Sequence, residues 1–171
     1  MNNWMTVKVR YTKQLDNGSF KRVTEPYVLA AMSFTDAEAR IYEELGSIIR
    51  GEFTVVSITR TEFHDIFHYE DADVWYKSVI SYGTEDEDTG KTKKVKNTFL
   101  VTATSVAEAT ERTKESLSGM MVDFNIDAVS ITPIVDLFPY NEESLDKEIS
   151  RFAPEPKDYE VTEELVDDLP Q

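Results

Sequence analysis

Apolar and polar residues alternate along residues 4–12, which predicts a strand with one buried face. The apolar side carries Met5, Val7, Val9 and Tyr11. The turn sequence at 16–18, Asp-Asn-Gly, then predicts a hairpin, so we expect a second strand over about 20–31. Pro26 cannot donate to a strand ladder, which favours an edge position or a bulge for that part of the strand.

A change of period after this hairpin predicts a helix. Ser33 is placed to cap it, with Asp36 three residues later. The helix carries an apolar stripe of Phe34, Ala37, Ile41, Leu45 and Ile48. Gly51 closes this region, and the β-branched stretch 53–63 predicts a third strand. Residues 1–70 therefore form a predicted β-β-α-β unit.

The same order of patterns recurs in the second half of the chain. Residues 4–11 match 75–82 at an offset of 71, and residues 33–37 match 105–109 at an offset of 72. The predicted strands of this half lie near 75–83, 92–103 and 124–132, and its predicted helix runs from about 106 to 118 behind Ser105. We predict an α+β fold of two tandem β-β-α-β repeats, 1–70 and 71–140, with antiparallel sheet covered by two helices. We expect a near-twofold rotation to relate the repeats.

The periodic pattern ends after Phe138. Residues 141–171 predict a short helix followed by a flexible acidic tail, because Pro154 and Pro156 break any element and the remainder has few apolar residues. The tip Asp167-Asp168-Leu169 resembles the acidic end of bacterial single-stranded-DNA-binding proteins, which docks replication partners. A purely solubilising tail is the alternative interpretation.

Charge is distributed unevenly along the 171 residues, whose formal net charge is −15. Residues 1–140 hold 15 basic and 22 acidic side chains, a net −7, and residues 141–171 hold 3 basic and 11 acidic side chains, a net −8. This balance argues against non-specific binding of duplex DNA. It still permits a local basic face on the body, shielded by the acidic tail.

The sequence contains few motifs that would indicate catalysis or metal binding. The chain has no cysteine, no Gly-rich phosphate loop and no G-x-S-x-G motif, so we expect neither an enzyme nor a cofactor and assign no catalytic residue. His64 and His68 have an HxxxH spacing but lie at a predicted strand end rather than on a helix, so we predict no metal site. We find no apolar run of membrane length and no basic segment followed by an apolar run at the N-terminus, and therefore expect a cytoplasmic protein.

The outer faces of the predicted strands combine rings with cations. The candidate nucleic-acid-binding residues are Trp4, Lys8, Arg10 and Arg22 in the first repeat, and Trp75, Lys77, Lys94 and Lys96 in the second. Phe20 lies on the same face of the first repeat. Single-stranded nucleic acid suits such a face, because bases stack on rings while cations follow the phosphates. The alternative is that the tryptophans pack under a helix or against the other repeat.

Several strings resemble an uncharacterised domain family of Bacteroidetes and their phages, including crAss-like phages. They are residues 23–27, 33–40, 53–55 and 73–77. The resemblance covers about residues 1–138 and implies a bacterial or phage cytoplasmic protein without an assigned activity.

Two functions therefore remain as hypotheses. The first is a single-stranded-DNA-binding accessory protein of replication or recombination, whose acidic tail docks a partner or shields the basic face. The second is a protein-binding module or acidic inhibitor of a host factor, which would use the acidic turn at 85–88 and the tail. The oligomeric state is left open.

Overall fold

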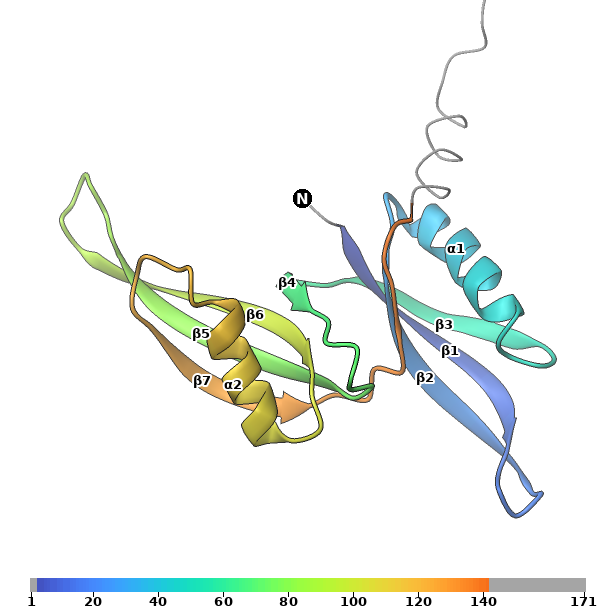
Figure 1. Ribbon diagram of the computed structural model, residues 1–171. Helices are drawn as coiled ribbons and strands as arrows, with labels where there is room; N and C mark the ends of the chain where they lie inside the picture. The colour runs from blue at the N-terminus through green and yellow to red at the C-terminus, as the bar shows by residue number, and fades with distance from the viewer. Residues whose placement is uncertain (1–2, 142–171) are drawn as a thin grey trace, which may run out of the picture. The chain divides into compact units, whose positions relative to one another are not determined.

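The structure, a computed structural model, describes residues 3–141 (Figure 1). One compact unit, Met1–Pro139, contains every helix and strand that the structure describes. The predicted acidic tail, including Asp167, Asp168 and Leu169, lies outside the described residues.

The fold is mixed α+β and consists mostly of strands, with two sheets and two helices. In chain order the elements are β1 (Trp4–Gln14), β2 (Phe20–Ala30), α1 (Phe34–Gly46), β3 (Phe53–Arg60), β4 (Phe63–Phe67), β5 (Trp75–Glu85), β6 (Thr92–Thr102), α2 (Val106–Ser116), β7 (Phe124–Ile131) and β8 (Leu137–Phe138). The predicted helix caps are confirmed, since Ser33 accepts from the Asp36 amide at 3.0 Å and Ser105 from the Glu108 amide at 3.1 Å. The short strands β4 and β8 were not predicted.

The two short strands connect each half of the chain to the sheet of the other half. One sheet has the order β3-β1-β2-β8 and the other has the order β4-β6-β5-β7. Thus β4, from the first half, pairs with β6, while β8, from the second half, pairs with β2 (Figure 1). Both of these pairings are parallel and all the others are antiparallel. The expected antiparallel sheet is therefore corrected to two mixed sheets.

The two exchanged pairings occupy corresponding positions. Ile66 of β4 lies opposite Leu100 of β6, and Leu137 of β8 lies opposite Val28 of β2. The offset of 71 relates Ile66 to Leu137, and the offset of 72 relates Val28 to Leu100. An aromatic stack accompanies each pairing, with ring centroids 5.2 Å apart for Phe67 and Phe99 and 5.9 Å apart for Tyr27 and Phe138.

An arginine from each helix holds the segment that follows an exchanged strand. The buried Arg40 of α1 donates to the carbonyl oxygen of Pro139 at 3.1 Å, just after β8. Arg112 of α2 donates to both carboxylate oxygens of Asp71, after β4, at 2.8 and 2.7 Å. Each guanidinium also donates to the carbonyl of the last residue of the adjoining strand, β2 or β6. Each guanidinium therefore ties the end of a long strand to the segment that follows an exchanged strand.

The apolar core has a large part under α1 and a second part between the two sheets. Under α1, the inward side of β1 and β2 packs on Ala37, Ile41 and Leu45. Between the sheets, Val28, Trp75 and Leu100 form a buried cluster. The core under α2 is more polar, because fully buried Ser78 and Thr113 take the positions that Val7 and Ile41 hold in the first half. We therefore expect the α2 side to be the less stable of the two.

The Ser78 hydroxyl is a testable weak point, since it is buried without a hydrogen-bond partner among the described residues. We predict that Ser78→Ala raises the free energy of unfolding by about 1 kcal/mol, because it removes a desolvated polar group. Ser81→Ala is the matched control, because the Ser81 hydroxyl is also buried but donates to Asp127 at 2.9 Å. That substitution should lower the free energy by about 1 kcal/mol. Urea unfolding measures both, and equal effects of the two changes would contradict the assignment.

Candidate nucleic-acid interface

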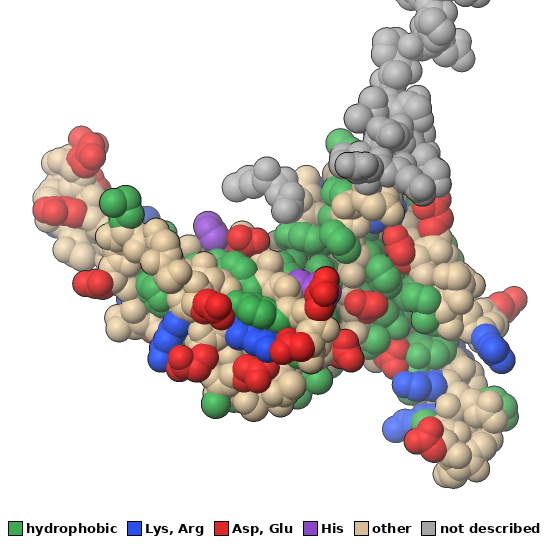
Figure 2. Space-filling view, in the orientation of Figure 1, with side chains coloured by type: hydrophobic (Ala, Val, Ile, Leu, Met, Phe, Trp, Pro, Cys, Tyr) green, Lys and Arg blue, Asp and Glu red, His purple; other side chains and the backbone are tan. Residues whose placement is uncertain are grey.

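The side of the β1–β2 hairpin that faces away from α1 carries a group of exposed cations and a ring. Lys8 and Arg10 project from β1, and Arg22 and Phe20 project from β2. The pairing of Arg10 with Thr24 places Arg22 diagonally opposite Arg10 on the same side. The Phe20 side chain is 71% exposed at the outer end of the hairpin. Figure 2 shows Lys and Arg side chains gathered along the outer part of this hairpin.

Acidic side chains are absent from that side of the three long strands. Across β1, β2 and β3, Glu25 is the sole acidic residue, and it points to the other side. There it accepts hydrogen bonds from the hydroxyls of Tyr11 at 2.8 Å and Tyr27 at 3.2 Å, and it pairs with Lys13 at 3.5 Å. The cations of the open side are therefore not neutralised by a neighbour within their own strands.

Glu25 contributes to raised pKa values of these two tyrosines, which can be measured. Burial, together with the hydrogen bond and charge of Glu25, raises the pKa of Tyr11 from 10.0 to about 12, and burial with the Glu25 charge also raises the pKa of Tyr27. Because the folded state holds the phenol protons more tightly, this contribution to stability is complete below pH 10 and is lost as pH rises towards 12. We predict that Glu25→Gln lowers the pKa of Tyr11 without restoring 10.0, because burial remains. Tyrosinate absorbance during alkaline titration measures this pKa, and an unchanged value would contradict the contact.

The corresponding side of the second sheet is less uniformly basic. Lys77 and Lys96 are exposed there, as expected from the strand alternation. Lys94 lies 3.9 Å from the Asp127 carboxylate, which also accepts the Ser81 hydroxyl. Asp127 is the extra residue of a bulge in β7, where the register with β5 shifts, and the corresponding bulge in β3 carries Val56 instead. An acidic group therefore stands among these lysines, in contrast to the first sheet.

The tryptophans lie in the core cluster between the sheets. Trp75 is only 2% exposed, and the His68 ring stacks on it with centroids 5.5 Å apart. Trp4 is half-buried and packs against the same cluster. The strand alternation correctly placed both rings on the side away from the helices, but residues around the exchanged strands cover that end. Trp75 has no exposed ring face on which a base could stack, so it is not part of the candidate interface. The exposed aromatic ring of that interface is Phe20.

The histidines lie in and just after β4. His64 contacts the Phe99 ring edge-on, with centroids 5.5 Å apart, and His68 packs on Trp75 as described. Over residues 3–141, no group of three side chains of the metal-binding types lies together. Neither of the two helices described is both long enough and apolar enough to cross a membrane.

A family model described as "Domain of unknown function (DUF4494)" matches residues 3–140. The chain belongs to this family. The match includes every helix and strand of the structure, so both sheets and the candidate interface fall inside the family's domain. No curated protein matches the chain.

Proposed function

We propose that the chain binds single-stranded nucleic acid along the open side of the β1–β2 hairpin, as an accessory protein of replication or recombination. One observation carries this proposal. The exposed ring of Phe20 shares one side of the hairpin with Arg22, Arg10 and Lys8, which follow it in a row along the strands, and Glu25 is turned away from that side.

The exposed Phe20 ring favours a single strand over a duplex, and the hairpin is long enough for several phosphate contacts. Lys8 and the position opposite Phe20 are six residues apart on β1, about 20 Å at the rise of a strand. That length offers successive phosphate contacts along one path. The Phe20 ring can stack only on a base that is unpaired and accessible. The lysines Lys77 and Lys96 of the second sheet would extend the basic surface.

The proposed setting is the cytoplasm of a bacterium of the Bacteroidetes or its phage. This setting rests on the family resemblance of the sequence strings. The paired sequence offsets of 71 and 72 support an origin by tandem duplication of a β-β-α-β unit. We further propose that the acidic residues after 153 compete with phosphate or recruit a partner protein, a role that rests on their charge alone.

The central prediction concerns Phe20 and its neighbouring cations. Phe20→Ala should weaken binding of a dye-labelled oligo-dT by about 1–3 kcal/mol, through loss of one stacked base. Arg10→Gln and Arg22→Gln should each reduce the slope of log K against log salt by about 0.7. Fluorescence anisotropy at several salt concentrations measures both effects. Lys13→Gln is the matched control, because Lys13 lies on the same hairpin but pairs with Glu25 on the other side.

The most sensitive form of this binding test uses a chain truncated after residue 153 at low salt, where electrostatic binding is strongest. Absence of oligo-dT binding by that chain, or equal effects of Phe20→Ala and Lys13→Gln, would contradict the proposal. The protein-binding module would then be the better account. It is favoured by the β5–β6 turn, whose exposed side chains Glu85, Asp86, Glu87 and Asp88 are all acidic; the backbone hydrogen bond from Asp88 also lowers the pKa of Asp86.

A further inference from the structure

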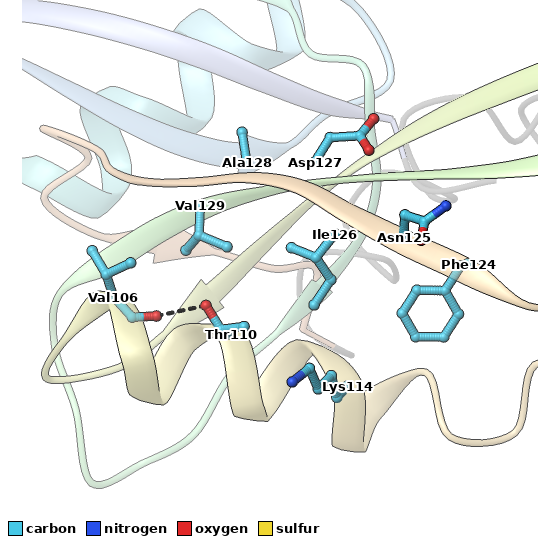
Figure 3. A pocket seen from close by; sticks show the side chains of 9 residues that line it. All are labelled: Val106, Thr110, Lys114, Phe124, Asn125, Ile126, Asp127, Ala128 and Val129. Atoms are coloured by element: carbon cyan, nitrogen blue, oxygen red, sulfur yellow. Dashed lines mark hydrogen bonds between the residues drawn. The ribbon is translucent and has the colours of Figure 1, made fainter.

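An open groove runs between α2 and β7 (Figure 3). Val106, Thr110 and Lys114 line it from the helix, and Phe124, Ile126 and Val129 line it from the strand. Its volume is about 700 Å³. Asp127 projects to the other side of β7, so Lys114 is the one charged side chain that this view places on the groove.

In the first half, side chains of α1 and β3 make contacts across the corresponding line. Tyr42 of α1 stacks on Phe53 of β3 with ring centroids 4.9 Å apart. The guanidinium of Arg60 lies over the Phe34 ring at 5.4 Å. These contacts join α1 to β3 along the line that stays open in the second half.

Substitution at the corresponding positions explains the difference. The offset of 72 places Lys114 at the position of Tyr42, so the ring that would stack on Phe124 is missing. The same offset places Val106 at the position of Phe34, and the offset of 71 places Ile131 at that of Arg60. Val106 and Ile131 are 49% and 64% exposed. The second half therefore presents an apolar strip that lacks both of the contacts joining α1 to β3, although Phe34 and Tyr42 are themselves 48% and 44% exposed.

The position of β7 selects the shape of an occupant. It is the outermost strand of its sheet, so its outer edge has no strand partner within residues 3–141. An extended peptide can add to such an edge through main-chain hydrogen bonds and insert alternate side chains into an adjacent pocket. The bulge at Asp127 interrupts the ladder, which leaves Ala128–Ile131 as the regular run next to Val106.

We propose that this groove binds an extended peptide segment of a partner protein, with one apolar side chain between α2 and β7 and one carboxylate at Lys114. The apolar walls favour an aliphatic or aromatic side chain. Lys114 pairs with Glu111 at 3.2 Å on the same helix, but both side chains are largely exposed, so a carboxylate on the peptide can replace Glu111 at little cost. This surface is distinct from the β1–β2 hairpin and does not depend on nucleic-acid binding.

The test begins with a phage-displayed library of random decapeptides selected on the full chain. The expected peptides carry an apolar residue close to an aspartate or glutamate. Lys114→Tyr should reduce their affinity at least tenfold, because the new ring can stack on Phe124 as Tyr42 stacks on Phe53, and it should leave the melting temperature unchanged or higher. Lys114→Met should keep apolar binding but lose the preference for acidic peptides.

Two further measurements separate this groove from any other site. Tyr42→Lys combined with Arg60→Ile removes both contacts between α1 and β3 and should add a second binding site, seen as a rise in stoichiometry by calorimetry. In the unmodified chain, a selected peptide should slow amide exchange in Ala128–Ile131. No enrichment above background, or peptides that bind Lys114→Tyr as tightly as the original chain, would overturn the proposal.

Discussion

The arrangement of this protein depends on the exchange of two short strands between its halves. β4 completes the sheet of the second half and β8 completes the sheet of the first, each as a parallel edge strand. A strand forms a ladder only with a partner, and β4 and β8, with five and two residues, each find that partner in the other half. Each is held by the sheet that it joins and by a stacked aromatic pair. In addition, an arginine from one of the helices donates hydrogen bonds to the chain just after the strand.

This exchange decides which surfaces remain available for binding. It buries Trp75 and covers part of Trp4, whereas the outer end of the β1–β2 hairpin stays exposed with Phe20 and its neighbouring cations. The two halves also differ in the surfaces that they leave exposed. The first half joins α1 to β3 through Tyr42 and keeps an acid-free basic side, while the second leaves the groove open beside Lys114. The two proposed binding surfaces thus lie in different halves of the domain.

The sequence predicted the long strands, both helices and their serine caps, because these depend on local periodicity and on side chains three residues apart. It could not predict β4 and β8, since a two-residue strand has no period and its pairing depends on a sheet formed by distant residues. The candidate site likewise has one part that the sequence predicted and one part that it did not. Alternation placed Lys8, Arg10 and Arg22 on the open side, but the burial of Trp75 depends on the long-range exchange. The open groove was also missed, although the replacement of Tyr42 by Lys114 at the corresponding position was a usable signal.

Cleavage of the link between β4 and β5 tests the strand exchange most directly. A specific protease site can be inserted after Asp73, which is exposed and follows the Asp71–Arg112 contact. After cleavage, each fragment still contributes one strand to the other fragment's sheet. The account predicts that both fragments elute together from gel filtration at the position of the uncut chain and unfold in a single transition. Separation of the fragments without denaturant at micromolar concentration would contradict it.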